Sequence, residues 1–223
     1  MTSRPIQNAA RPALAGVIIV VAVAMTFVAQ KAVASDAPTQ QAWLLSTRQA
    51  PRGGDLEAGD EQIRYWRYSN LRAGNNQCWE PAVAKDLVEQ SDPTVPTVVF
   101  IHGNRSGLND AVRGGLPVYR YLQRCAEGRP LRFVIWAWPA DRAGRGVLDD
   151  ARIKARYSDA QSYYLADWLS QLASDGPVNL VGYSFGARVV TGALHLLGGG
   201  QVAGRSLPSE TQAEHGPLRA VLV

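Results

Sequence analysis

Three short apolar runs limit the folds that are open to this chain of 223 residues. They are rich in β-branched residues: TVVFI (97–101), LRFVIWAW (131–138) and VNLVGY (178–183). Runs of this kind are typical of parallel strands that are buried on both faces of a sheet. Because longer segments with helical spacing of apolar residues separate them, the sequence predicts an α/β fold with a mostly parallel sheet and helices on both faces.

The other segments extend this pattern in both directions. Helices are predicted in four segments, at residues 81–90, 108–126, 149–173 and 185–197. The first begins with Pro81, and Gly114, Gly115 and Pro117 are expected to break the first half of the second. Further strands are predicted at residues 42–48, 62–69 and 219–223. Turn residues separate the first two of these strands, which are therefore expected to form an antiparallel pair.

An N-terminal apolar segment stands apart from this pattern. Arg4 and Arg11 precede the apolar run at residues 12–29, and AVA at 32–34 has the small-x-small spacing that a signal peptidase recognises. The combination predicts a secretory signal peptide, whereas a buried core helix is disfavoured so close behind N-terminal arginines. The alternative is an uncleaved membrane anchor through residues 12–29, because about 18 apolar residues can span a bilayer. Either possibility places the domain outside the cytoplasm.

The predicted domain organisation follows from this segment. Residues 1–34 are the signal peptide or anchor, residues 35–41 a linker, and residues 42–223 a single α/β domain. Three of the positive charges behind the formal net charge of +4 lie in residues 1–34, which hold no acid, so the rest of the chain is near +1. The sequence has no basic stripe with interleaved aromatic residues, and nucleic acid is therefore not expected as a partner.

The chain has two cysteines, Cys78 and Cys125. Two cysteines in an oxidising compartment are often joined, so a disulfide between them is expected. The alternative is a pair of separate buried thiols. Neither a CxxC pair nor a histidine cluster accompanies them, and the sequence predicts no metal site.

Two unusual motifs follow predicted strands at their carboxyl ends, where open parallel sheets bind ligands. HGN (102–104) comes directly after the first apolar run, and GYSFG (182–186) joins the third run to a helix. The second motif fits G-x-S-x-G, in which a strand turns sharply into a helix and Gly182 and Gly186 relieve the crowding around Ser184. Ser184 is therefore predicted as an exposed nucleophile; the alternative is a serine that caps the helix.

The helix that begins after Ser184 favours the same chemistry. Its N-terminus directs free N–H groups and a positive partial charge at the turn. A tetrahedral intermediate of acyl transfer needs a hydroxyl that attacks and backbone donors that hold the oxyanion. The two motifs together therefore indicate acyl transfer.

With these motifs in these positions, the sequence resembles the α/β-hydrolase superfamily. The resemblance covers residues from about 97 to 223, with weaker support from 42 to 69. IWAWP (135–139), together with the HG turn, is similar to a bacterial hydrolase-like family of unknown function. The two tryptophans in this stretch, Trp136 and Trp138, are expected in the core of a strand rather than against a substrate.

The resemblance also implies roles for single residues. HGN is similar to the superfamily's oxyanion loop, in which His102 and Gly103 support the motif and Gly103 allows close approach. The backbone N–H groups of Asn104 and Phe185 would form the oxyanion hole. Neither a metal nor an organic cofactor is implied.

The resemblance implies a histidine base that follows the serine and is oriented by a carboxylate, in the order serine, acid, histidine. His195 lies 11 residues after Ser184 in the same predicted helix, about 16 Å away. His215 precedes the last predicted strand and is expected at the opposite edge of the sheet, and His102 belongs to the oxyanion loop. None of the three histidines is well placed as the base.

The carboxylates are no better placed. Asp141 follows the second apolar run and is expected at the carboxyl edge of the sheet, whereas Asp149 and Asp150 are typical of the acidic first turn of a helix. The last predicted strand, RAVLV (219–223), has neither a cap nor a turn after it. We therefore expect an incomplete chain, with the acid and the histidine of the triad beyond residue 223.

The expected function is that of an exported serine hydrolase of the esterase type, which acts through Ser184 on the acyl ester of a small molecule or lipid. The identity of the substrate is left open. One alternative is a non-catalytic module of the same fold that binds a partner. Another is a dehalogenase- or peroxidase-type member of the fold, although a serine rather than an aspartate at the turn argues against a dehalogenase.

Overall fold

Each of the three apolar runs forms a buried strand at the centre of one sheet. The computed structural model describes residues 40–53, 60–69, 78–89, 92, 94–172, 176–208 and 217–223. β4 (Thr97–Ile101) lies between β5 (Leu131–Ala137) and β6 (Val178–Gly182), and both neighbours run parallel to it. Every residue of these strands is buried, as expected for a sheet that is covered on both faces.

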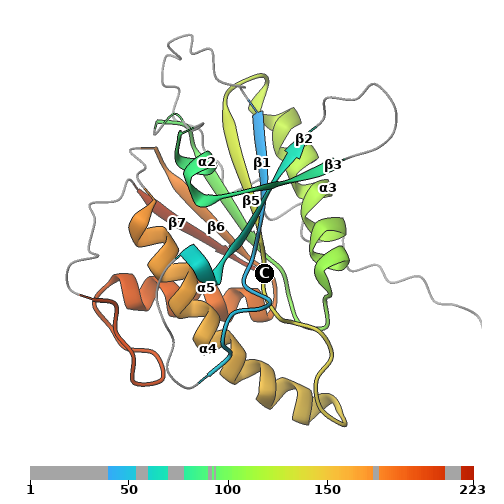
Figure 1. Cartoon of the computed structure of the whole chain (residues 1–223), viewed down its shortest axis with the longest axis vertical. Helices are drawn as coiled ribbons and strands as arrows, with labels where there is room; N and C mark the ends of the chain where they lie inside the picture. Colours follow the sequence, from blue (N-terminus) through green and yellow to red (C-terminus); the bar gives the residue numbers. More distant parts are fainter. Residues whose placement is uncertain are drawn as a thin grey trace, which may run out of the picture.

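Four further strands complete the sheet within the described residues (Figure 1). β1 (Gln40–Ser46) is parallel to β5, and β7 (Leu218–Leu222) is parallel to β6. β2 (Arg64–Ser69), which follows the 3-10 helix η1 (Asp60–Gln62), and β3 (Cys78–Ala82) are antiparallel additions beyond β1. The strand order is β3-β2-β1-β5-β4-β6-β7. The predicted α/β class, with a mostly parallel sheet that starts with an antiparallel pair, is confirmed.

Helices cover the two faces of this sheet (Figure 1). α3 (Leu108–Ala126) packs on one face, and α4 (Val147–Gln171) and α5 (Phe185–Leu197) pack on the other. The short helix α2 (Ala84–Glu89) adds Leu87 to the core on the side of α4 and α5. Each long helix presents an apolar stripe to the sheet, which is the reason for the helical spacing in the sequence.

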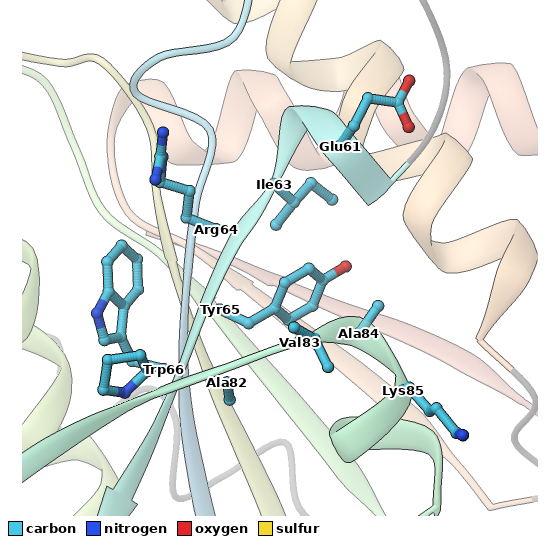
Figure 2. A pocket seen from close by; sticks show the side chains of 10 residues that line it. Glu61, Ile63, Arg64, Tyr65, Trp66, Ala82, Val83, Ala84 and Lys85 are labelled. Carbon is cyan, nitrogen blue, oxygen red and sulfur yellow. The ribbon is translucent and has the colours of Figure 1, made fainter.

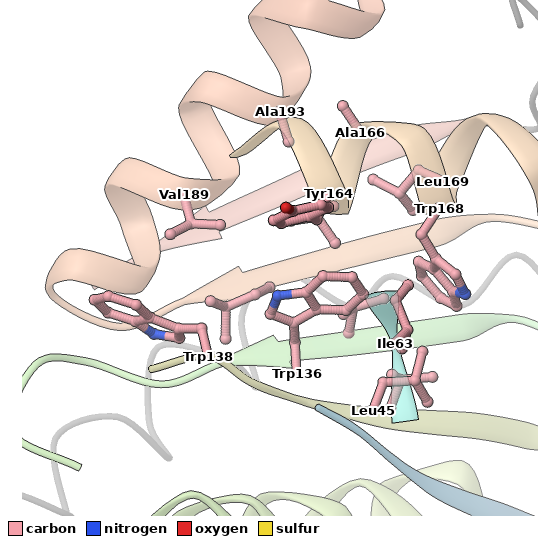
Figure 3. Close-up of a cluster of buried hydrophobic side chains, with 14 of the residues drawn as sticks. Leu45, Ile63, Trp136, Trp138, Tyr164, Ala166, Trp168, Leu169, Val189 and Ala193 are labelled. Atoms are coloured by element: carbon pink, nitrogen blue, oxygen red, sulfur yellow. The ribbon is translucent and has the colours of Figure 1, made fainter. Parts of the chain in front are cut away.

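The larger core lies between the sheet and the pair α4 and α5 (Figure 3). Trp136 of β5 and Trp138, just after it, are both 0% exposed and belong to the same cluster as Tyr164 and Trp168 of α4. The prediction that the two tryptophans belong to the core is therefore confirmed. Large aromatic side chains dominate the energy of such a core, and here they support the strands whose ends form the candidate site.

Two sequence predictions about helices are wrong. Pro81, expected at the start of a helix, lies in β3 opposite Trp66 of β2, and the helix begins at Ala84. Among the described residues β3 pairs only with β2, and an edge strand tolerates a proline that cannot donate to the ladder. The expected break in α3 does not occur either, because the helix is continuous from Leu108 to Ala126 through Pro117.

The two adjacent glycines of α3 differ in their surroundings. A Cβ on Gly115 would lie 2.6 Å from the Cγ1 and Cδ1 atoms of Ile135, whereas a Cβ on Gly114 would lie 3.8 Å from Phe100. We expect Gly115→Ala to lower the free energy of unfolding by about 1–3 kcal/mol through overpacking. Gly114→Ala is expected to raise it by about 0.5–1 kcal/mol, because alanine is the better helix former. Urea denaturation measures both changes, and effects of equal sign would contradict this difference in packing.

The cysteine prediction is not met by the structure. Cys125 is a free, exposed thiol near the end of α3, and so it does not form the expected disulfide. The side chain of its expected partner, Cys78, is not among those that the structure describes. Leu122 and Val118, which share the predicted apolar spacing with Cys125, are buried. The buried stripe of α3 continues from Leu122 to Ala126, and Cys125 lies beside it with its thiol at the surface.

The predictions for the N-terminal segment fall outside the described residues. The signal peptide or anchor at residues 1–34 and most of the linker at 35–41 belong to this part of the chain. The first described strand begins at Gln40, two residues before the predicted domain boundary. In the part of the chain that the structure describes, no helix is long and apolar enough to cross a bilayer.

Candidate active site

The two motifs HGN and GYSFG meet at the carboxyl edge of the sheet. β4 and β6 are neighbouring parallel strands, and each motif starts at or just after the end of its strand. A Cβ on Gly103 would lie 3.2 Å from the Cβ of Ser184 and 3.0 Å from Cδ1 of Tyr183. The absence of a side chain at Gly103 therefore brings the two motifs into contact, at the edge where parallel sheets bind ligands.

Ser184 stands at the junction of β6 and α5 in a conformation that serine rarely adopts. Its φ is 54° and its ψ is −117°, and the residue is exposed. Such a conformation costs a non-glycine residue about 1–3 kcal/mol and is found mostly at functional sites. The side chain makes no capping hydrogen bond to the helix, so the alternative role of Ser184 as a helix cap is wrong.

The glycines on either side of Ser184 leave room for this turn. A Cβ on Gly182 would lie 2.6 Å from the Cα of Ala187. A Cβ on Gly186 would meet the carbonyl group of Ile101 in β4 and lie 2.8 Å from its carbon. The backbones of β4, β6 and α5 therefore come together around Ser184, which is the crowding that the G-x-S-x-G pattern predicts.

The backbone N–H groups near Ser184 differ in whether they have a hydrogen-bond acceptor. The N–H of Ser184 itself donates to the carbonyl oxygen of Val223 at 2.6 Å. The N–H groups of Asn104 and of Phe185, the first residue of α5, find no acceptor within the described ranges. The first N–H groups of a helix have no partner inside the helix and carry a positive partial charge. Asn104 and Phe185 are the residues whose N–H groups the resemblance implies as donors of an oxyanion hole.

Asn104 is anchored to helix α4 by a buried carboxylate, Asp150. Its Nδ2 donates to Oδ2 of Asp150 at 2.9 Å, and its Oδ1 accepts the N–H of Arg105 at 2.8 Å. Nε of Arg105 donates to Asp150 at 3.2 Å, and the N–H of Ala143 donates to it at 2.7 Å. Because the Asp150 side chain is 1% exposed, the loop after β4 is held by an acceptor that water scarcely reaches.

Asp150 remains ionised in spite of its burial. Burial by itself would raise its pKa, but the hydrogen bonds from Ala143, Asn104 and Arg105 hold the pKa of Asp150 below its ordinary value. The positive charge of Lys154, one turn further along α4, acts in the same direction. Lys154 is also buried, and its Nζ lies 4.8 Å from the centre of the Tyr157 ring.

His102 supports the loop from inside the core and is not placed to act as a base. Its Nδ1 donates to the carbonyl oxygen of Gly103 at 2.9 Å, and its Nε2 accepts the N–H of Trp138 at 3.3 Å. The indole N–H of Trp138 donates to the carbonyl oxygen of His102 at 2.8 Å, and the two rings are stacked. Burial lowers the pKa of His102 to about 4, so the ring is neutral and both its nitrogens are engaged.

The other two histidines are not brought to Ser184 by the described structure. His195 is exposed in the last turn of α5, about 16 Å along the helix from Ser184. His215 lies outside the described residues. Pro217, which follows it, is held at the amino edge of the sheet, where its carbonyl oxygen accepts the N–H of Val178.

The predicted acids have other partners. Asp141 lies at the carboxyl edge, as predicted, and is paired with Arg48. Asp149 is exposed and accepts the N–H of Arg145 at 3.0 Å. In the described part of the chain, no group of three or more histidine, cysteine, aspartate or glutamate side chains is placed to hold a metal ion.

Asp150 is the site residue whose role the sequence did not predict. The sequence placed it with Asp149 in an acidic first turn, and the two residues differ in burial in the structure. The sequence does contain one signal that separates Asp150 from Asp149. Asp150, Lys154, Gln161 and Tyr164 share one face of a helix, and all are buried. Polar residues on the buried face of a helix need partners, so this pattern indicates that the Asp150 carboxylate is bonded within the fold.

A separate hollow lies near the edge of the sheet that is opposite to β6 and β7. It has a volume of about 690 Å³ and lies between the start of β2, the end of β3 and the start of α2 (Figure 2). Ile63, Tyr65 and Ala82 line it, with Glu61 and Lys85 at its border. Three strands separate β2 from β6, and neighbouring strands are about 4.8 Å apart, so this hollow is not part of the site at Ser184.

Comparison with known proteins does not assign the chain to a family. No family model, no curated protein and no solved structure matches it. The chemistry of the site therefore has to follow from its own geometry.

Proposed function

We propose that this protein is an exported serine hydrolase of the esterase type, built on the α/β-hydrolase fold. The observation that carries the proposal is the state of Ser184, an exposed and strained serine between a parallel strand and a helix, without a capping hydrogen bond. Two glycines leave room for this turn, and two free N–H groups lie on the adjoining segments. An acyl ester of a small molecule or lipid is the proposed substrate.

The proposed reaction begins with attack of the Ser184 Oγ on the carbonyl carbon of the ester. The carbonyl oxygen becomes negatively charged and accepts hydrogen bonds from the N–H groups of Asn104 and Phe185. Each donor of this kind contributes a factor of about 10²–10³ to the rate of acyl transfer. The intermediate then expels the alcohol and leaves an acyl group on Ser184, which water removes. Nothing in these steps requires a metal or an organic cofactor.

The proton of Ser184 has to pass to a base outside the described residues. His102 uses both ring nitrogens in the core, and His195 lies at the far end of α5. This observation favours a second candidate function, a non-catalytic module of the same fold that binds a partner. The two candidates differ in whether Ser184 reacts.

Labelling with a fluorophosphonate probe tests the proposal. The full chain is incubated with the probe, with and without added imidazole as an external base, and the labelled peptide is identified by mass spectrometry. We expect phosphonylation of Ser184 alone, and its loss in Ser184→Ala. Labelling that rises strongly with imidazole would show that the chain does not supply the base, whereas labelling independent of imidazole would show that it does.

Ser206, which is exposed, serves as an internal control for nonspecific phosphonylation. Equal labelling of Ser206 and Ser184 would mean that Ser184 has no special reactivity. The absence of label on Ser184 under both conditions would overturn the hydrolase and favour the binding module.

A further inference from the structure

We infer that Asp150 is a positioning residue that holds the Asn104 N–H in the orientation of an oxyanion donor. The inference rests on the proposed function, because it assigns Asp150 a part in the same site. The hydrogen bonds of Asp150 in the described residues go to Asn104, Arg105 and Ala143 and not to Ser184, so it acts through the loop after β4. It is therefore a positioning residue and not a catalytic one.

The loop after β4 is fixed on both sides of Asn104. Before it, Gly103 packs against Tyr183 and Ser184. After it, Arg105 has a positive φ of 58°, a conformation that needs support from its surroundings. Both polar atoms of the Asn104 side chain are bonded, one to Asp150 and one to the N–H of Arg105. The side chain of Asn104 thus orients the peptide group that carries its own N–H.

A carboxylate suits this position better than any other side chain of its size. The groups that meet Asp150, from Asn104, Arg105 and Ala143, are all donors. An amide in its place would turn an N–H toward at least one of these donors and leave a buried group without an acceptor. The adjacent Lys154 balances the negative charge inside the protein.

The neighbouring residue Asp149 provides a matched control. It stands in the same first turn of α4 but is exposed, and it accepts only the N–H of Arg145 among the hydrogen bonds that the described residues show. Its replacement removes the same charge from the same turn without touching the loop after β4. A general effect of charge on the helix or on the site would therefore appear in both variants.

The experiment separates formation of the oxyanion from reactivity of the nucleophile. It uses the full chain with Ser184→Cys, so that a thiolate attacks without a histidine base, and with Cys125→Ser to remove an exposed thiol. With p-nitrophenyl acetate, the thiolate attacks the carbonyl carbon, an oxyanion forms, p-nitrophenolate leaves and a thioester remains. With iodoacetamide, the thiolate displaces iodide from a saturated carbon and no oxyanion forms. Peptide mapping follows both products at position 184.

We expect Asp150→Asn to lower the rate of acylation by about tenfold to a hundredfold, since a displaced donor loses most of its effect. The rate of alkylation should stay within about twofold, and Asp149→Asn should change neither rate. Asn104→Ala should reproduce the loss while Asp150 keeps its contacts with Arg105, Ala143 and Lys154. The double variant of Asn104 and Asp150 should lose no more than either single variant, because both act through one hydrogen bond.

Three outcomes would contradict this inference. Unchanged acylation in Asp150→Asn and Asn104→Ala would overturn the positioning role alone. An equal fall in acylation and alkylation would show that Asp150 only stabilises the fold. A ratio of acylation to alkylation no higher than that of free cysteine, with Asp150 in place, would mean that no oxyanion hole exists and that the proposed function fails. If Asp150→Asn does not fold, Asn104→Ala alone decides between these results.

Discussion

Ser184→Gly is expected to raise the free energy of unfolding by about 1 kcal/mol while it removes the proposed nucleophile. The φ of 54° and ψ of −117° at Ser184 strain a residue that has a Cβ. Relief of that strain contributes about 1–3 kcal/mol, and the greater freedom of glycine in the unfolded chain offsets about 0.5–1 kcal/mol of it. A more stable and inactive variant would show that the protein holds this serine in place at a cost to its own stability.

The loss of activity in Ser184→Gly should be large. In serine hydrolases the removal of the nucleophile lowers kcat by a factor on the order of 10⁶. Hydrolysis of a p-nitrophenyl ester measures this loss in protein whose Ser184 labels without added imidazole, because the full loss requires a base in place. Urea denaturation measures the stability. Ser184→Ala is the matched control, because it also removes the hydroxyl but keeps the Cβ and the strain. Equal stability of the glycine and alanine variants would contradict the strain argument.

Gly186→Ala is expected to lower the free energy of unfolding by about 3 kcal/mol or more. The new Cβ would meet the carbonyl oxygen of Ile101 and would lie 2.8 Å from the carbonyl carbon of that residue and 2.9 Å from the carbonyl oxygen of His102. These are backbone atoms of β4 and its loop, which cannot turn aside as a flexible side chain does, so the overpacking exceeds the usual 1–3 kcal/mol. The strain should also separate α5 from β4 and widen the site.

Gly53→Ala is the control for this variant, because a Cβ there would have no atom within 4 Å. Its effect on stability should stay within about 0.5 kcal/mol, as for most surface substitutions. Urea denaturation of both variants gives the comparison. A Gly186→Ala protein as stable as the Gly53→Ala protein would contradict the close approach of the α5 and β4 backbones at Gly186.

The sequence was sufficient to predict the central strands of the sheet and the turn at Ser184. Strand β4 (Thr97–Ile101) and helix α5 (Phe185–Leu197) have the predicted bounds, because continuous apolar runs and glycine stops are local properties. The turn at Ser184 was predictable for the same reason, since G-x-S-x-G lies within one short segment. The sequence placed both motifs at the carboxyl edge, and the pairing of β4 with β6 in the structure brings Gly103 into contact with Ser184.

Features that depend on tertiary contacts could not be predicted. Gly115 looked like a helix breaker, and only the position of Ile135 shows that it allows α3 to pack closely on the sheet. Helical spacing distinguishes Asp150 from Asp149, but the partners of the Asp150 carboxylate depend on where the loop after β4 lies. The pairing of Cys125 was a similar case, since a count of cysteines contains no distance.

The proposed oxyanion donors are backbone groups, and this affects how the site responds to mutation. A substitution at Phe185 replaces a side chain but leaves the N–H in its place, and at Asn104 it changes the orientation of the N–H without deleting it. Among the described residues, Ser184 is the one position where the proposed chemistry depends directly on a side chain. Exposed residues near the site that neither pack against the turn at Ser184 nor hold the loop after β4 can therefore vary in size and polarity while the reaction stays the same. Such an arrangement would allow the range of accepted substrates to evolve separately from the catalytic step.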